Sequence, residues 1–294
     1  RPTGMTGFVM NTRRAQFTDW RVREAMLRAF NFEYMNEAIT GGRQPRIASY
    51  FSGTDLGMRA GAATGRVADL LAPFAADLPP DTLEGYTMPQ SDGSLRNRKN
   101  IRAAMKLMEE AGYSAEGGVM KNAQGQPFTF DLLLPQGSAE KQSFAEIFAQ
   151  ALTRMGITAR IDVVDNAQYF ARQQDYDYDM TDFRRDLSLS PGNEQLLYWG
   201  ADGVDTPGSR NLMGMNVPAA EAMISTMLAA TDRDDFVAAT RALDRILTAG
   251  RYVIPTYQFD VGRIAHIKQL RFPDHTPIYG EGYWFTPEVW WYEN

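Results

Sequence analysis

The spacing of apolar residues predicts helices in several stretches of the chain. In each stretch an apolar residue returns every three or four positions, which places these residues on one face of a helix. The longer predicted helices span residues 19–39, 100–111, 138–155 and 233–249, and the shorter ones span 66–74, 167–173 and 218–230. Thr18 or Asp19 is expected to cap the first helix and Asn100 the second, because short polar side chains accept hydrogen bonds from the first turn.

Short apolar runs predict strands between these helices. The predicted strands span residues 6–11, 127–134, 157–165 and 252–259. The second and third flank the helix at 138–155, and a strand–helix–strand unit of this length implies a parallel crossover. Strands and helices that alternate in this way predict an α/β fold in which helices flank a central sheet.

The segment DYDYDM (Asp175–Met180) alternates acidic residues with aromatic or apolar ones. Its three aspartates have the spacing of the first ligands of a calcium loop. However, Met180 and Asp186 stand where that loop requires glycine and glutamate, so a calcium site is not expected. A period of two predicts a strand whose tyrosines face the core. Such a strand would carry the chain to the loop that follows it.

Composition narrows the classes of function. The 294 residues carry a net charge of −6 with both signs interspersed, whereas a nucleic-acid binder needs a basic face. There is no cysteine and there are two histidines, which excludes thiol catalysis and disulfides and disfavours a histidine-based metal site. No run of 18 apolar residues occurs, so no membrane-spanning helix is expected. We expect no metal and no cofactor.

The loop after DYDYDM is the main candidate for a binding site. It places Ser188, Ser190 and Asn193 around a Pro-Gly turn, with Tyr198 and Trp199 close behind. Ligands of open α/β sheets bind in the loops at the carboxyl ends of strands, so small hydroxyls and amides there suit binding. A polar turn beside core aromatics explains the same residues equally well. The sequence leaves both interpretations open.

An enzyme is the alternative class. The chain has no G-x-S-x-G elbow, no Walker loop and no G-x-G-x-x-G fingerprint. A carboxylate-based, glycosidase-like hydrolase remains open, because its two acidic residues can come from distant segments. We assign no residue a catalytic role.

The stretch NTRRAQFTDWRVREAMLRAFNFEYMN (Asn11–Asn36) resembles the extracellular solute-binding proteins of family 5, the peptide/nickel-type receptors of ABC importers. Segments at Ser49–Leu56, Ser188–Gln195, Gly208–Gly214 and Ala239–Leu247 are similar to the subgroup that takes up oligopeptides and microcin C. The resemblance covers essentially the whole chain.

The resemblance implies a lobe of the periplasmic binding protein-like, type II fold, with a central mixed β-sheet flanked by helices. Residues 1–260 would form lobe two of a bilobal receptor. Residues 261–294 would form a C-terminal segment that crosses back to lobe one. Family members are longer on the N-terminal side, so we expect the chain to be a C-terminal fragment that lacks most of lobe one.

The resemblance also implies the function. Such a receptor is a periplasmic monomer that captures a peptide or peptide-like compound between two lobes and delivers it to the membrane permease, without catalysis. A family-5 receptor for an oligosaccharide or a metal chelate is the alternative within the family. Asp186 is the nearest match to the acid that pairs with a peptide's α-amino group, and Arg184 or Arg185 would instead favour an anionic group. The other cleft candidates are Ser188, Ser190, Asn193 and Asn211.

Overall fold

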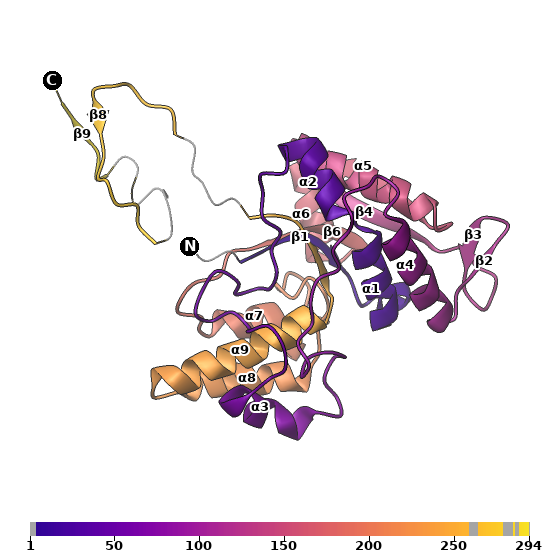
Figure 1. Cartoon of the computed structure of the whole chain (residues 1–294), viewed down its shortest axis with the longest axis horizontal. Helices are drawn as coiled ribbons and strands as arrows, with labels where there is room; N and C mark the ends of the chain where they lie inside the picture. Colours follow the sequence, from indigo (N-terminus) through magenta and orange to yellow (C-terminus); the bar gives the residue numbers. More distant parts are fainter. Residues whose placement is uncertain (1–3, 259–263, 279–284, 286–287, 294) are drawn as a thin grey trace.

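A five-stranded sheet lies between two layers of helices in the computed structural model (Figure 1). The structure describes residues 4–258, 264–278, 285 and 288–293. The strands of the sheet, in chain order, are β1 (Met5–Met10), β4 (Thr129–Pro135), β5 (Thr158–Val164), β6 (Met180–Arg185) and β7 (Val253–Pro255). Their order across the sheet is β5-β4-β6-β1-β7. This arrangement confirms an α/β lobe with a central sheet.

The sheet is mixed. β4 pairs with β5 and with β6 in parallel, whereas β1 runs antiparallel to both of its neighbours, β6 and β7. The parallel pair β4–β5 is connected through helix α5 (Ala139–Thr153), as the crossover prediction required. The four strands other than β1 therefore point the same way.

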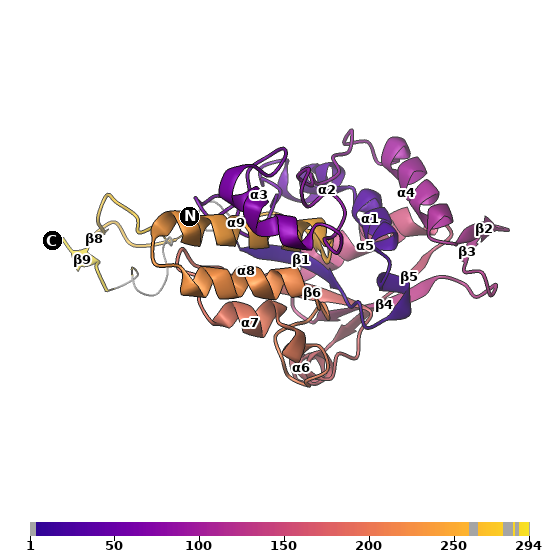
Figure 2. The same ribbon diagram turned by 90° about the horizontal axis from the view of Figure 1, so that it is seen from below.

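Helices cover both faces of the sheet, and each face has its own hydrophobic core. One face lies under α1 (Trp20–Ala29), α2 (Phe32–Thr40), α4 (Arg98–Glu110) and α5. The other lies under α3 (Gly65–Leu71), α6 (Asn166–Gln174), α7 (Glu194–Trp199), α8 (Pro218–Ala229) and α9 (Arg233–Ala249). Figure 2 shows the two layers from below, with the strands between them.

Alternating residues of the strands supply the two cores. In β1, Phe8 and Met10 belong to the core under α1, whereas Val9 belongs to the core under α9. In β4, Leu132 and Leu133 divide in the same way. Full burial of such a side chain contributes about 1.5–3 kcal/mol, so a strand of this pattern stabilises both layers at once.

The N-terminal helix prediction is correct in its start and wrong in its length. Asp19 accepts a hydrogen bond from the backbone N–H of Arg21 at 2.8 Å and caps α1. The predicted single helix through residue 39 is two helices, because Phe30 leaves the helical region with ψ of 100°. The amide of Asn31 then donates to the carbonyl of Ser94 at 2.8 Å, which ties the break to a distant loop.

Two further predictions of local structure are corrected. Helix α4 begins after Asn97, which has φ of +43°, so Asn100 is not its cap. The Asn100 amide instead donates to the carbonyl of Gln90 at 2.9 Å. The predicted strand at 252–259 is β7, which is shorter, and residue 259 lies outside the described residues.

The alternation at Asp175–Met180 predicted a strand, but residues 175–179 form no strand. Tyr176 has φ of +54° and lies in a turn after α6, and β6 begins at Met180. Tyr176 and Tyr178 are nevertheless buried, and their hydroxyls donate to carbonyls inside the lobe, including that of Leu212 at 2.7 Å. The alternation therefore predicted burial correctly and backbone geometry wrongly, since a turn can also bury every second side chain.

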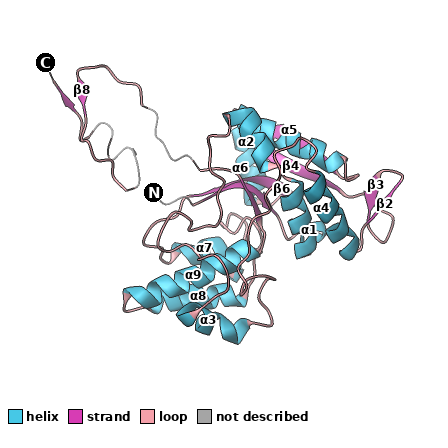
Figure 3. Ribbon diagram, viewed as in Figure 1, coloured by secondary structure: helices cyan, strands magenta, loops and turns pink. Residues whose placement is uncertain are grey.

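Irregular segments connect these elements (Figure 3). The stretch 78–94, which is rich in proline and glycine, contains no helix or strand. A small hairpin, β2 (Ser114–Glu116) and β3 (Val119–Lys121), precedes β4. The described part of the C-terminal tail contains the short pair β8 (Leu270–Arg271) and β9 (Trp291–Tyr292), which stands apart from the sheet in Figure 1.

Candidate functional site

One edge of the sheet collects the loops that the sequence singled out. The parallel strands β4, β5 and β6 end at this edge, and antiparallel β1 begins there, with Met5 opposite Arg185. Gly4 has φ of +62°, and a Cβ at this position would lie 2.1 Å from the carbonyl oxygen of Arg185, so the close approach requires glycine. We call the end of β6 together with residues 184–193 the ligand edge.

Arg184 and Asp186 lie together at the ligand edge. The Arg184 Nε is 3.1 Å from the Asp186 Oδ1, and the two side chains are 69% and 73% exposed. An ion pair so exposed contributes little to stability, because water screens both charges. Either group can therefore exchange its partner for a charged group of a ligand at small cost.

Ser188, Ser190 and Asn193 follow in the same loop. The Ser188 hydroxyl accepts the backbone N–H of Ser190 at 3.2 Å, which forms a local turn. Ser190 and Asn193 are exposed, and no side-chain hydrogen bond from Asn193 caps α7. The structure thus brings these three residues together and leaves their polar groups accessible to solvent.

Arg185 is a candidate that the sequence named second to Arg184. Its guanidinium carbon lies 4.1 Å from the centroid of the Tyr198 ring, and its Nη2 donates to the carbonyl of Arg210 at 3.3 Å. Burial lowers the pKa of Arg185, while Tyr198 acts in the opposite direction. Its Nε is buried and has no hydrogen-bond partner among the described residues. Arg185 is thus a cation held in place beside the ligand edge, where its charge suits an anionic group.

A second loop meets the ligand edge. Residues 53–56, together with Leu189, Ser190, Arg233 and Ile278, surround a hollow of about 470 Å³. Within this hollow, Arg233 and Asp55 form an exposed ion pair of 3.0 Å. The segment Ser49–Leu56, which carries part of the family resemblance, therefore lies beside Leu189 and Ser190 of the ligand edge.

Asp244, in the middle of α9, fixes this second loop. Its carboxylate is fully buried and accepts the backbone N–H groups of Tyr50, Phe51 and Met58 at 2.8–3.2 Å. It also accepts the Ser49 hydroxyl at 2.7 Å. Burial raises the pKa of Asp244, and these hydrogen bonds partly offset that rise. Asp244 does not line the hollow. It holds Tyr50, Phe51 and Met58, which stand on either side of the lining residues 53–56.

Asn211 has a structural role. Its side chain is fully buried, and its amide donates to the carbonyls of Gly200 and Met215 at 3.0 and 2.7 Å. Its Oδ1 accepts the N–H of Met215 at 2.9 Å. Every polar atom of this amide is bonded inside the lobe, so we leave Asn211 out of the proposed ligand contacts.

The motif at Asn11–Arg14 is also structural here. Asn11 donates to the carbonyls of Tyr176 and Tyr178 at 3.2 and 3.0 Å, which holds the turn before β6. Arg13 donates to the carbonyl of Asn211 at 2.9 Å and lies 3.6 Å from the centroid of the Tyr176 ring. This motif positions the strand that leads to the ligand edge.

The sequence analysis assigned no role to Asp244, and it did not decide between Arg184 and Arg185. A carboxylate among Leu243, Ile246 and Leu247 on the apolar face of α9 is the signal for Asp244, because a charge on a core face needs partners. The partners themselves lie almost 200 positions away along the chain, so the sequence does not show them.

The acidic groups at the site, Asp186 and Asp55, are exposed and paired with arginines. Among the described residues, no group of three or more His, Asp or Glu side chains is placed to hold a metal ion. In the part of the chain that the structure describes, no helix is long and apolar enough to cross a membrane.

Comparison with known proteins gives curated relatives that are about twice as long as this chain. The chain is 39% identical over 291 residues to the peptidoglycan-binding protein YepA of Agrobacterium fabrum, covering 99% of this chain and 46% of that protein. It is 37% identical over 289 residues to the probable peptide-binding protein YejA of the same organism, covering 98% and 46%. The chain thus spans about half the length of these relatives.

A solved structure shares the fold. The oligopeptide-binding protein AppA from Bacillus subtilis, in complex with a nonapeptide, matches with a TM-score of 0.72 at 15% identity, covering 100% of this chain and 51% of that chain. This likeness confirms the type II periplasmic binding protein fold. The family model described as "Bacterial extracellular solute-binding proteins, family 5 Middle" matches residues 1–206. The chain belongs to the bacterial extracellular solute-binding proteins of family 5.

Proposed function

We propose that this chain is part of the substrate-binding component of an ABC importer that captures oligopeptides or peptide-like compounds. The ligand would lie between two lobes that close on it by hinge motion, and the loaded receptor would deliver it to the permease in the membrane. The observation that carries this proposal is the ligand edge, where accessible charges and hydroxyls gather at the carboxyl ends of parallel strands. The printed names of relatives, peptidoglycan-binding and peptide-binding, agree with it.

Each group at the ligand edge has a part in this proposal. Asp186 would exchange Arg184 for the α-amino group of a peptide, since its present ion pair is exposed and weak. Arg185, whose guanidinium lies over the Tyr198 ring, would donate hydrogen bonds to a ligand carboxylate. Ser188, Ser190 and Asn193 would bond to the peptide backbone.

The division into lobes is part of the same proposal. Residues 1–260 would form lobe two, and the segment 261–294 would cross back to lobe one. Four apolar side chains of the described tail are at least half exposed, which fits a surface that another lobe covers. These side chains are Ile267, Ile278, Trp291 and Tyr292. Of the other tail aromatics, Tyr279, Tyr283 and Trp284 lie outside the described residues.

We further infer a periplasmic, monomeric receptor with no cofactor, no nucleic-acid partner and no catalytic step. A hydrolase reading requires two carboxylates that converge on a substrate, and Asp186 and Asp55 each pair with an arginine instead. Turnover of a glycoside panel by the longer protein would overturn the binding proposal.

The direct test is native mass spectrometry of compounds retained by the longer protein that contains both lobes. Retained oligopeptides, or peptides linked to cell-wall sugar, support the proposal. Retained metal chelates or oligosaccharides without peptide would contradict the ligand class while leaving the family unchanged. The 294-residue chain alone should bind weakly, because it offers one wall of the cleft.

A further inference from the structure

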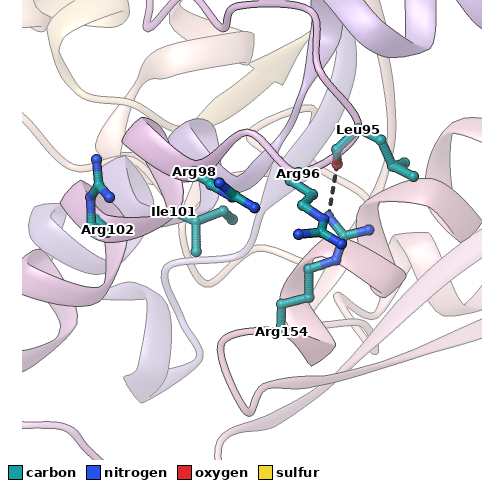
Figure 4. A pocket seen from close by; sticks show the side chains of 6 residues that line it. All are labelled: Leu95, Arg96, Arg98, Ile101, Arg102 and Arg154. Atoms are coloured by element: carbon teal, nitrogen blue, oxygen red, sulfur yellow. Dashed lines mark hydrogen bonds between the residues drawn. The ribbon is translucent and has the colours of Figure 1, made fainter.

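A cluster of arginines lies at the end of the sheet opposite the ligand edge. It surrounds a hollow of about 340 Å³, which we call the arginine pocket. The residues that line it are Leu95, Arg96, Arg98, Ile101, Arg102 and Arg154. Figure 4 shows these side chains around the hollow, with the hydrogen bond from Arg154 to the Leu95 carbonyl dashed.

The arginine pocket does not belong to the ligand edge. Arg154 follows α5 and comes shortly before β5, which begins at Thr158. β5 and β6 both run parallel to β4, so the start of β5 and the end of β6 at Arg185 lie at opposite ends of the sheet. Figure 1 shows α4, which carries Arg98 and Arg102, on the far side from the chain's N-terminus.

The arginines of this pocket lack acidic partners. Among the described residues, no ion pair involves Arg96, Arg98, Arg102 or Arg154, and the single polar contact is Arg154 Nη1 to the Leu95 carbonyl at 2.8 Å. Arg160, on β5, pairs with Asp131 at 2.7 Å, whereas exposed Arg43 and Arg59 have no ion pair among the described residues but stand singly. The chain has 36 acidic residues against 30 basic ones, so unpaired cations in one place are not a consequence of composition.

Helix stability does not explain this arrangement. Arg98 is the first residue of α4 and Arg102 lies one turn later, and like charges at this spacing repel. The positive end of the helix dipole lies there as well, and it disfavours cations. No side chain caps this helix end, because the Asn97 amide donates to the carbonyl of Arg28 instead. A bound anion would remove each of these unfavourable terms.

The number of guanidinium groups indicates which anion fits. The carboxylates of this lobe are matched by one or two arginines, as Asp19 is by Arg21 and Glu24 by Arg28 and Arg251. Four arginines line the arginine pocket, and several guanidinium groups together match a group with more oxygens and up to two charges, which is a phosphate. We propose that the arginine pocket binds a phosphate group, either of a free phosphate compound or of a phospholipid headgroup. Leu95 lies beside the arginines and is 48% exposed. An exposed apolar side chain there could contact either a free phosphate compound or the lipid that carries a headgroup.

Two probes separate the sources: calorimetric titration with pyrophosphate, and sedimentation with vesicles of phosphatidylglycerol or phosphatidylcholine at two salt concentrations. Binding of pyrophosphate alone supports a free phosphate ligand. Sedimentation with phosphatidylglycerol but not phosphatidylcholine supports a headgroup. Absence of both kinds of binding overturns the proposal. Polyglutamate that binds as well as pyrophosphate also overturns it, because the pocket would then accept any polyanion.

The variant Arg98→Gln/Arg102→Gln removes two charges of the pocket, and we expect at least tenfold weaker binding of the probe. Its urea unfolding midpoint should stay the same or rise, since the two cations repel each other. Arg43→Gln/Lys268→Gln, which removes two exposed cations elsewhere, is the matched control and should bind normally. Equal loss in the control would overturn the site. Arg96→Gln/Arg154→Gln repeats the test from the other side of the pocket.

Discussion

The interior of this lobe and its ligand edge hold charges in opposite ways. Arg251 and Glu24 are 2% and 4% exposed, lie 2.9 Å apart, and have further partners within the fold. Arg184 and Asp186 are about as close, yet both are mostly exposed. The buried pair joins segments that are far apart in the sequence, since Arg251 also donates to the carbonyl of Pro80. The exposed pair joins two residues of the ligand edge that lie close together in the sequence. Accessibility, rather than the presence of charge, separates structural groups from candidate ligand contacts.

The largest expected effect concerns the buried pair. Arg251→Met leaves Glu24 as a buried carboxylate that has lost one of its two arginines, and it removes the hydrogen bond to the carbonyl of Pro80. We expect a loss of about 3–5 kcal/mol in the free energy of unfolding by urea. Arg184→Met at the ligand edge should change it by less than about 0.5 kcal/mol. Similar losses for both variants would remove the contrast between interior and edge.

A smaller effect is expected at Asp244. In Asp244→Asn a single oxygen remains to accept hydrogen bonds from Ser49, Tyr50, Phe51 and Met58, so buried donors lose their acceptor. The expected cost is about 2–4 kcal/mol. In this variant the backbone amides of Tyr50, Phe51 and Met58 should exchange hydrogen faster than in the unaltered protein. The rest of the lobe should change less. Unchanged exchange would mean that Asp244 does not position the loop.

A matched pair of asparagines sharpens the comparison further. Asn211→Ala should cost about 2 kcal/mol, because two carbonyls and one N–H lose their buried partner. Asn193→Ala should change stability by less than about 0.5 kcal/mol, since its side chain is exposed and caps nothing. Thermal unfolding of the two variants under one condition decides between these expectations. A larger loss for Asn193→Ala would reverse our assignment of the two residues.

The sequence predicted the fold best where local signals agreed. Helix α9 has the predicted bounds, because Asp232 caps it and its apolar face is continuous. The first helix was predicted too long, since the apolar spacing continues through the break at Phe30, and the contact of Asn31 with Ser94 beside that break is not visible in the sequence. The turn at Asp175–Met180 was predicted as a strand because burial alternates in both structures.

The candidate site was partly predictable for a related reason. The order of elements shows that a polar loop follows a core strand, and that was enough to select Ser188, Ser190 and Asn193. The exposure of each side chain, which the structure supplies, separates the remaining candidates. Asn211 and Asn193 carry the same polar group, but Asn211 is buried and has a structural role, whereas Asn193 is exposed. Asp244 acts on residues far away in sequence, so its contribution required the structure.

The most direct test of the account is calorimetry of the two-lobed receptor that we propose, with a panel of tripeptides to pentapeptides, each in free and N-acetylated form. Asp186→Asn should lower affinity for the free peptides about tenfold, or about 1.4 kcal/mol, and leave the acetylated forms unchanged. Asp69→Asn, which alters an exposed aspartate of α3, serves as the control. If Asp186→Asn binds free peptides as tightly as the unaltered protein, the ligand edge is not where the peptide's amino group is held.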